Sequence, residues 1–403
     1  MANTLSALNP EYWSKRVQYL LKNTLVANEI CNYEEQSTMK NGDVVHRTIP
    51  TDITVNDYSA GSDVTVQDQA VTDETLSIDI SKEVSTYYDM NEMKQNSLDY
   101  INQFFIDRAA YRLRDEMDAR VLREIENAVV DFDDGDIGGT DGNGIAITKD
   151  NCEEVFSESW AKLSEQGVEK DKPRVAVVTP SVAAKMRSSN ILNGYDRADQ
   201  SLAEWFLSKN YQGKYLGWNV YESQNVSHKT VITYTGQPSA DDAFDVAGVT
   251  FTFVASPSSA GDVDIGADAD GSYANLAAAI NGGAWAGSTY IALSTANRNT
   301  LTKLNVVATQ DATANTLSIV TAGKATVQEN ESDPLDNATT SSTVALCYLA
   351  RQGATDMVAQ FQPTVQKNKA PLRNGYFFIL WNLYGIKTFD EGTNRMIELN
   401  VNA

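Results

Sequence analysis

The sequence contains very few of the residues that carry acid–base chemistry or bind metals. Of its 403 residues only two are histidine, His46 and His228, and three are cysteine, Cys31, Cys152 and Cys347. Neither histidine has a second ligand at a spacing typical of a metal site, and three scattered cysteines favour reduced cytosolic thiols over a disulfide framework. The GxGxxG, Walker and GxSxG motifs are missing as well. We therefore predict no catalytic residue, no cofactor and no metal, and expect that the protein is not an enzyme.

Long apolar runs and cations are also scarce. No stretch approaches the 18 apolar residues of a membrane span, and the N-terminal MANTLSALNPEYW lacks the basic-then-apolar pattern of a signal peptide. The chain has 32 lysines and arginines against 54 aspartates and glutamates, a formal net charge of −22. Such a chain repels nucleic acid and anionic lipid, so we expect neither specific DNA binding nor a membrane partner.

The stretch that organises the chain is a predicted long helix over residues 90–130. It contains no proline or glycine, Asp89 precedes it as an N-cap, and the glycine-rich DDGDIGGTDGNG follows it. A helix of this length measures roughly 60 Å. Its apolar residues recur mostly every four positions, so the apolar stripe winds and different parts should pack on different neighbours. A coiled coil is the alternative, but its 3.5-residue repeat is missing. The apolar positions are Leu98, Ile101, Phe105, Ala109, Leu113, Met117, Val121 and Ile125.

Two segments before this helix have too few apolar residues for a core of their own. Residues 1–45 form an N-terminal arm with a short amphipathic helix around Trp13, which we expect to pack on the body or on a neighbouring subunit. Residues 46–88 predict a strand, a polar tip and a returning strand. An isolated two-stranded ribbon is marginal in water, so we expect this one to lie on another chain.

The acidic loop over residues 131–150 has two interpretations. Asp131, Asp133, Asp134, Asp136 and Asp141 could surround a calcium ion. However, the glycine lies at the wrong offset and the bidentate glutamate of a calcium loop is missing. A solvated turn is the simpler interpretation.

The remaining chain predicts an α/β unit interrupted by a second module. In residues 151–227 we expect helices over 152–166 and 181–192, a buried strand over 173–180, a helical turn over 202–207 and a strand pair over 213–226. Residues 228–343 are rich in Ala, Thr, Ser, Asp and Gly, with four basic and twelve acidic residues. They predict an inserted α+β module. It has strands over 249–255, 262–265, 304–309 and 316–321 and a helix over 272–281. After it we expect a helix over 344–353, a polar segment over 361–372 and strands over 375–386 and 398–401.

This order of parts resembles the major capsid protein of tailed bacteriophages, whose fold is shared with encapsulins and herpesvirus capsid floors. The resemblance covers residues 1–227 and 344–403. It rests on the strings AVTDETLSIDIS (70–81), RAAYRLRDEMDARVL (108–122), PRVAVVTPSVAAKM (173–186), GWNVYESQNV (217–226) and MVAQFQ…YGIKTFDEG (357–392). The stretch 228–343 looks like the inserted domain of some short-tailed phage coat proteins. The implied α+β fold has an N-terminal arm (1–45), an extended loop (46–88), a spine helix with the start of a peripheral domain (89–150), an axial domain (151–227), the insert (228–343) and the axial return with peripheral strands (344–403).

The resemblance implies a structural subunit that assembles with copies of itself, as hexamers and pentamers, around double-stranded DNA. It also implies a portal and, because the arm begins almost at once, a separate scaffolding protein. Some relatives crosslink through a lysine in the extended loop, but residues 41–81 contain none. The alternative is an encapsulin-like compartment that houses an enzyme cargo. On the arm and the ribbon, the side chains that we expect to contact neighbouring subunits are Trp13, Tyr58, Val64, Val66 and Leu76.

Overall fold

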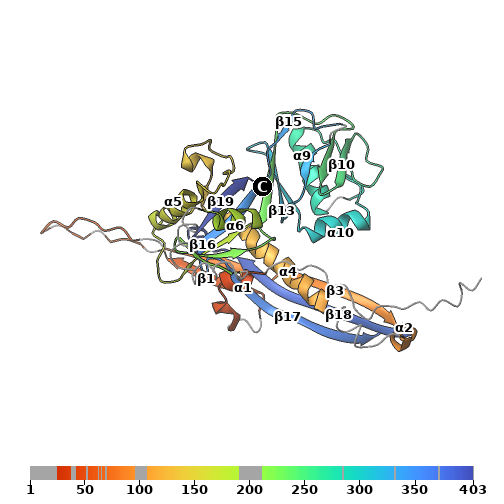
Figure 1. Cartoon of the computed structure of the whole chain (residues 1–403), viewed down its shortest axis with the longest axis horizontal. Helices are drawn as coiled ribbons and strands as arrows, with labels where there is room; N and C mark the ends of the chain where they lie inside the picture. The colour runs from red at the N-terminus through yellow and green to blue at the C-terminus, as the bar shows by residue number, and fades with distance from the viewer. Residues whose placement is uncertain are drawn as a thin grey trace, which may run out of the picture.

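The computed structural model describes residues 25–37, 42–50, 53–61, 63–64, 66–68, 70–95, 107–189, 211–283, 286–330, 333–370 and 373–402. Their strands form four sheets, of two, three, four and ten strands. In Figure 1 the three-stranded sheet runs along the lower edge of the molecule, and the ten-stranded sheet lies above its left end and extends into a lobe at the upper right. The mixture of helices and several sheets confirms the predicted α+β class.

The ten-stranded sheet holds the main core. β5 (Arg174–Val178) is buried at all five positions, as predicted. β7 (Trp218–Glu222) runs parallel to β5 and antiparallel to β6 (Tyr211–Tyr215), which confirms the predicted strand pair. α5 (Cys152–Glu165) and α6 (Pro180–Arg187) add their apolar faces to the same core. The predicted helical turn over 202–207 lies outside the described residues.

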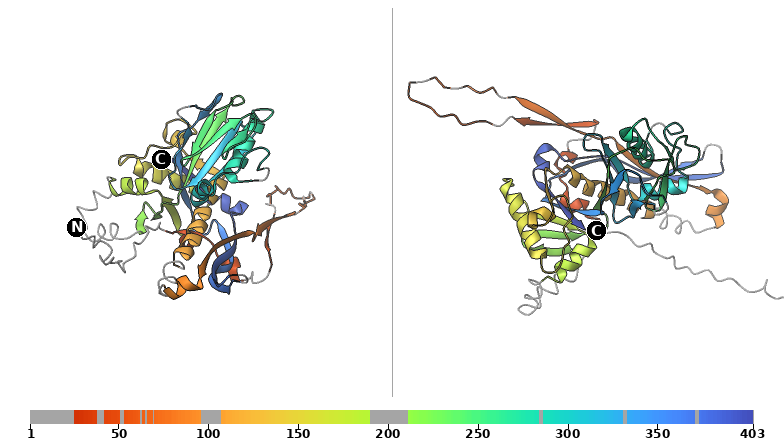
Figure 2. Two further views of the ribbon diagram at one scale, coloured as in Figure 1. Left: turned by 90° about the vertical axis from the view of Figure 1, so that its right-hand side faces the viewer. Right: turned by 90° about the horizontal axis from the view of Figure 1, so that it is seen from above.

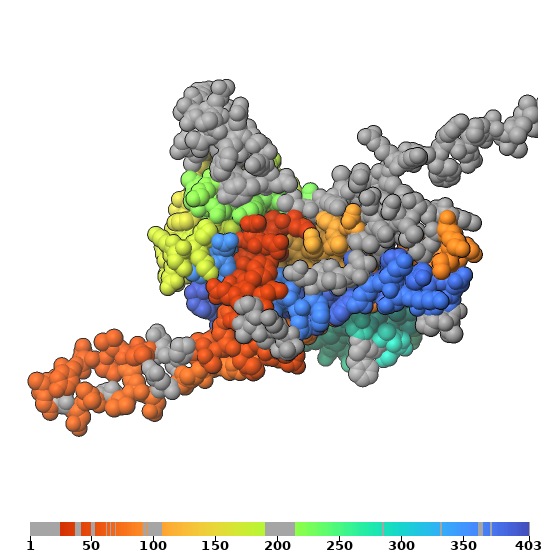
Figure 3. All heavy atoms as spheres, turned by 90° about the horizontal axis from the view of Figure 1, so that it is seen from below, coloured from red at the N-terminus to blue at the C-terminus, as the bar shows by residue number. Residues whose placement is uncertain are grey.

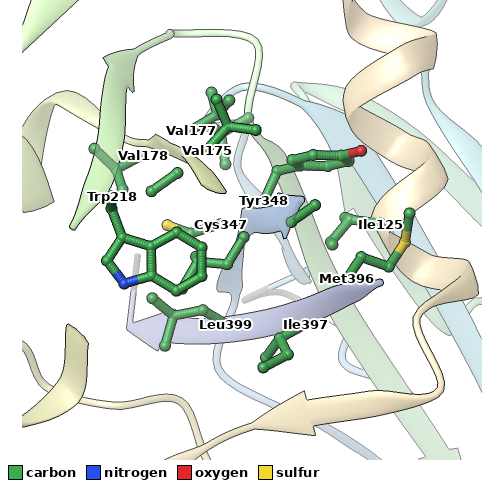
Figure 4. Packing of buried hydrophobic residues seen from close by; sticks show 14 of the residues in the cluster. Ile125, Val175, Val177, Val178, Trp218, Cys347, Tyr348, Met396, Ile397 and Leu399 are labelled. Carbon is green, nitrogen blue, oxygen red and sulfur yellow. The ribbon is translucent and has the colours of Figure 1, made fainter. Parts of the chain in front are cut away.

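The apolar run that predicted a helix over 344–353 is instead the strand β16 (Val344–Arg351). It pairs with β19 (Met396–Asn402) on one side and with β5 and β8 (Ser227–Tyr234) on the other. Seven of its eight residues are buried. A strand buried on both faces is apolar throughout, so its sequence has no alternation that would distinguish it from a buried helix. Figure 4 shows Cys347 and Tyr348 of β16 among side chains of β5, β7 and β19.

The three-stranded sheet consists of β17 (Asp356–Lys369), β18 (Gly375–Lys387) and β3 (Ile80–Asp89), all antiparallel. β18 confirms the strand predicted over 375–386. The polar segment over 361–372, for which no strand was predicted, lies mostly in β17. Two register irregularities, between Ala359 and Phe361 and between Phe361 and Thr364, accompany this polar stretch.

Both described parts of the predicted long helix, at its two ends, are helical. α2 (Met90–Gln95) begins after Asp89, whose carboxylate accepts a hydrogen bond from the Asn91 amide at 2.9 Å, and α4 covers Asp107–Arg123. Residues 96–106, with Leu98, Ile101 and Phe105, lie outside the described residues. The predicted end at Val130 is wrong. After η4 (Glu124–Asn127) the backbone extends at Ala128, because β4 (Val130–Phe132) joins the central sheet beside β19.

Successive parts of α4 pack on different neighbours, as the winding stripe predicts. Ala109 and Leu113 contact Leu380 of β18, whereas Val121 and Leu122 enter the central core. The helix therefore connects the three-stranded sheet to the ten-stranded one. None of the helices in the described part of the chain is long and apolar enough to cross a membrane.

The lobe at the upper right of Figure 1 is built by residues of the predicted insert. It has its own hydrophobic cluster, which includes Phe251 and Tyr273. β8 belongs to both parts: its first three residues pair with β16, and all but its last residue pair with β13. The helix α10 was not predicted, because Leu301 is its only buried residue and so it has no apolar periodicity. The elements of the lobe are β9 (Ala243–Val246), β10 (Val249–Val254), β11 (Asp262–Asp264), α9 (Ala269–Asn281), α10 (Thr295–Lys303), β12 (Val307–Asp311), β13 (Thr316–Ala322), β14 (Val327–Glu329) and β15 (Ala338–Thr340).

Candidate assembly surfaces

A two-stranded ribbon projects from the body. β1 (Val44–Pro50) and β2 (Val71–Ser77) pair antiparallel, from Val44 opposite Ser77 to Pro50 opposite Val71. They form a sheet of their own, and the chain between them continues outward as an irregular tip. Figures 2 and 3 show the ribbon and its tip standing clear of the rest of the molecule. The predicted strand, tip and returning strand are thus confirmed as far as Ser77, whereas residues 80–88, predicted as part of the same ribbon, lie in β3 of the three-stranded sheet.

The ribbon tip, which we define as residues 53–70, exposes apolar side chains. Val55 is 99% exposed, Val66 83%, Val64 71% and Tyr58 67%. In water such surface contributes nothing to the folding of one subunit. Of the predicted contact residues, the structure therefore brings Tyr58, Val64 and Val66 together on one projecting segment. Their contact with another copy stays a prediction.

Leu76 does not belong with this group. Its side chain is fully buried and packs with Val45, Ile78, Val358 and Phe389. Alternation along β2 turns Leu76 toward the body of its own chain. The prediction that Leu76 faces a neighbouring subunit is therefore wrong; it anchors the ribbon instead.

A buried ion pair fixes the base of the ribbon. The Arg47 guanidinium donates to both carboxylate oxygens of Asp356, at 3.1 and 3.2 Å, and lies 4.2 Å from the centre of the Phe389 ring. Asp356 is only 3% exposed. Burial raises the pKa of Asp356, while the hydrogen bonds and charge of Arg47 act in the opposite direction. The pair thus joins β1 to the start of β17 and sets the direction in which the ribbon leaves. Sequence reasoning missed both residues, since nothing in the local pattern links positions so far apart.

The other strand of the ribbon is held by β18. Lys387 donates to the Thr75 carbonyl oxygen at 3.0 Å. A Cβ atom on Gly385 would lie 2.4 Å from the Ser77 carbonyl oxygen, so only glycine allows β18 to pass this close to the end of β2. The amide of Asp390, at the start of α11 (Asp390–Thr393), donates to Glu74 at 3.2 Å. The ribbon therefore has a fixed base and a free end.

The described part of the arm begins at Leu25 and lies on the body. Ile30 is fully buried in the central core, at the end of α1 (Ala27–Ile30). After η2 (Glu34–Ser37), the chain continues into the ribbon. Gln36 donates to the Ala359 carbonyl oxygen of β17 at 2.7 Å. Trp13 and the predicted arm helix lie outside the described residues, so their contact with a neighbour stays a prediction.

The acidic loop directs its carboxylates at its own backbone. Asp133 accepts hydrogen bonds from the amides of Gly135 and Gly142, at 2.8 and 2.5 Å, and caps η5 (Asp134–Ile137). Asp136 binds the Lys162 ammonium at 2.7 Å. Among the described residues, no cluster of three or more His, Cys, Asp or Glu side chains is arranged to hold a metal ion. The calcium interpretation gains no support from this geometry.

The two histidines lie in separate places. His46 is exposed on the ribbon, 2.6 Å from Asp73, whereas His228 is buried in β8 with its Nδ1 2.9 Å from the Val226 carbonyl oxygen. Burial lowers the pKa of His228. Within the described residues neither ring has a hydrogen bond to a serine hydroxyl or a cysteine thiol. This arrangement offers no pair of nucleophile and base.

The fold has counterparts among solved structures. No protein-family model matches the chain, and no curated protein matches it in sequence. A structure from Mycobacterium phage Che8 is similar with a TM-score of 0.56 at 15% identity, over 98% of this chain and 97% of that one. The capsid structure of cyanophage P-SCSP1u gives 0.51 at 11% identity, over 100% and 96%. The capsid structure of Helicobacter pylori bacteriophage KHP30 gives 0.52 at 8% identity, over 100% and 97%. The chain has the fold seen in these phage capsids, as the resemblance predicts.

Proposed function

We propose that this chain is the structural subunit of an icosahedral shell, which assembles as hexamers and pentamers around the double-stranded DNA genome of a tailed phage. The ribbon carries the proposal: a capsid-fold chain holds it firmly at the base and leaves its apolar tip uncovered. Other copies of the chain are the surface on which this tip becomes buried. The shell is the virion capsid, assembled in the host cytoplasm, and its role is structural rather than enzymatic.

The energetics of the tip suit repeated weak contacts. Burying one exposed valine or tyrosine side chain is favourable by roughly 1.5–3 kcal/mol. Val55, Tyr58, Val64 and Val66 together provide several such contributions per subunit, against the entropy lost when the tip becomes ordered. Each contact is modest, but a closed shell repeats it at every subunit, so the assembled particle is far more stable than any one pair.

The charge of the chain suits a container. A net charge of −22 disfavours adhesion of packed DNA to the wall, so the genome is enclosed without specific binding. Assembly in this proposal also needs a separate scaffolding protein and a portal. The part that we assign to binding neighbours is the arm with the extended loop, residues 1–88. The peripheral and axial domains, residues 89–227 and 344–403, form the wall, and the insert, residues 228–343, is an additional domain.

Shortening the ribbon tests the proposal. Because Pro50 and Val71 are the last paired residues, replacing residues 51–70 with Asn-Gly closes the ribbon with a two-residue turn. We expect a soluble subunit with an unchanged thermal midpoint that forms no shells. Sedimentation velocity and negative-stain electron microscopy measure this, for the full chain and the variant, each coexpressed with a candidate scaffolding protein. Normal particles from the shortened chain would refute the proposal.

The contents of the particles separate the proposal from the encapsulin alternative. Nucleic acid inside shells from infected cells supports a genome container, whereas a packaged enzyme would identify a cargo compartment. The lobe of residues 228–343 speaks against the alternative, because the resemblance that includes it is to phage coat proteins.

A further inference from the structure

One carboxylate in the middle of α4 receives hydrogen bonds from two other segments. Asp118 Oδ1 accepts the backbone amides of Val26 and Ala27, at 2.7 and 2.8 Å, where the arm joins the body. Asp118 Oδ2 accepts the side-chain amide of Asn225 at 3.0 Å. The Asp118 side chain is only 1% exposed. The arm base is the red segment across the centre of Figure 3.

Burying an aspartate at this position costs free energy unless its carboxylate is hydrogen-bonded. Within the described part of the chain, the hydrogen-bond donors to Asp118 are neutral, two backbone amides and one side-chain amide. A buried carboxylate without a cation costs free energy that an apolar residue of similar size avoids. The alignment of three donors on its two oxygens is what distinguishes Asp118 from a packing residue.

The third donor connects the arm base to another part of the molecule. Asn225 lies two residues before β8, the strand through which the chain enters the insert. Its amide also donates to Asp115, one turn earlier on α4, at 2.9 Å. Three segments distant in sequence, the arm base, α4 and the root of the insert, therefore meet at two carboxylates of one helix face.

We propose that Asp118 is the positioning residue of the arm: its carboxylate holds the arm backbone at Val26 and Ala27 against α4, and ties that point to the root of the insert. The use of a fixed arm position rests on the proposed function, in which the arm contacts neighbouring subunits. The hydrogen bonds from Val26, Ala27 and Asn225 to Asp118, which we call the clamp, do not rest on that function and can be tested on an unassembled subunit.

A cavity adjoins Asp118. Asp118 lines a cavity of about 740 Å³ between the arm base, α4 and β17. Among the described titratable and charged groups that line the cavity or interact with Asp118, Asp115 and Arg114 come from its own helix, and Cys31, Tyr33 and Glu34 come from the arm. The loop before β8 contributes the neutral Asn225.

Protonation and docking of the arm base are linked. Burial, the largest influence, raises the pKa of Asp118 to about 6, although the amides of Val26 and Ala27 and the side chain of Asn225 act to lower it. We take burial by the docked arm to outweigh the opposite effect of its two amides, so the docked state should bind the proton more tightly than an undocked, hydrated state. Docking is therefore strongest below the ordinary pKa of an aspartate, and weakens as the pH rises through about 6.

Amide hydrogen exchange of the full-length, unassembled subunit tests the clamp. We expect the Val26 and Ala27 amides, followed by NMR or in a peptide spanning residues 25–31, to be protected. Asp118→Ala should speed their exchange at least about tenfold, because the hydrogen bonds from both amides to Asp118 are lost. Asp118→Asn keeps the size of the side chain and one oxygen that can accept a hydrogen bond, but it removes the titratable carboxyl. With exchange rates corrected for intrinsic pH dependence, the wild-type protection should fall between pH 5 and 7 and that of Asp118→Asn should stay flat.

Asp115→Asn is the matched control, because Asp115 also accepts from Asn225, whereas the amides of Val26 and Ala27 donate to Asp118. It should leave exchange at Val26 and Ala27 unchanged. Equal exchange in wild type and Asp118→Ala, or a pH profile that Asp118→Asn does not change, would overturn the proposal. Neither result would affect the proposed function, since shells that lack this clamp could still form. Conversely, if the chain with the shortened ribbon still assembled, the proposed function would be refuted but the clamp would not.

Discussion

The insert and the ribbon both branch from the body, but only the insert has a core of its own. Its cluster contains Phe244, Phe251 and Tyr273, all at most 1% exposed. The ribbon tip carries apolar residues too, yet Val55 and Val66 are almost fully exposed. The difference lies in how the apolar residues are arranged. The insert surrounds them with a sheet and a helix, whereas a single pair of strands has no second layer. A branch with its own core is stable where it stands, and a branch without one needs a partner.

The largest expected effect tests the independence of the insert. Phe251→Ala should destabilise it by about 3–5 kcal/mol, because the change leaves a cavity in its core. Calorimetry should show a lower thermal midpoint for unfolding of the insert and an unchanged midpoint for unfolding of the body. Phe156→Ala, equally buried in the central core, is the control and should lower the transition of the body. A single transition that both variants shift equally would break the comparison.

A smaller effect is expected at the ribbon base. Arg47→Met removes the cation beside buried Asp356 and should cost about 2 kcal/mol, less than for a fully buried pair because Arg47 is partly exposed. Protease cleavage within β1 and β2 should also become faster. His46→Gln is a control on the same strand: its pair with Asp73 is exposed, so the change should stay within about 0.5 kcal/mol. Equal effects would show that the base is not fixed by Arg47.

The smallest effect on the subunit is expected at the tip. Val64→Ser combined with Val66→Ser should change the free energy of unfolding by less than about 0.5 kcal/mol, because both side chains are already exposed. The same variant should assemble less, as measured by light scattering. Leu76→Ala provides the contrast, with a loss of about 2–5 kcal/mol from a buried site. Destabilisation of the isolated subunit by the tip variant would show that the tip packs on its own chain.

The comparison also explains what the sequence could reveal. The exposure of Tyr58, Val64 and Val66 was predictable, because a polar, turn-rich tip between two short strands has nothing to pack on. The burial of Leu76 was not, since alternation along β2 gives two faces without saying which one meets the body. The link between Arg47 and Asp356 joins residues more than three hundred positions apart, and no local pattern encodes it.

The fold was predictable to a similar degree. The continuous apolar run of β5 is a strand as expected, but the similar run of β16 was misread as a helix, because a strand buried on both faces has no period. β17 was missed because its outer half is polar. Asp115 and Asp118 give one usable signal. Two acidic residues three positions apart on the buried face of a helix indicate that hydrogen-bond donors from other segments lie beside them.

The strand shared by body and insert has a mechanical consequence. Since β8 pairs with β16 at its start and with β13 along all but its last residue, the two parts are joined by a continuous hydrogen-bonded ladder. A force that pulls on the insert must shear that ladder, with several bonds loaded at once, before the two parts can separate. If the subunit forms a shell as proposed, we expect the insert to move with the body as one unit and not on a hinge at β8.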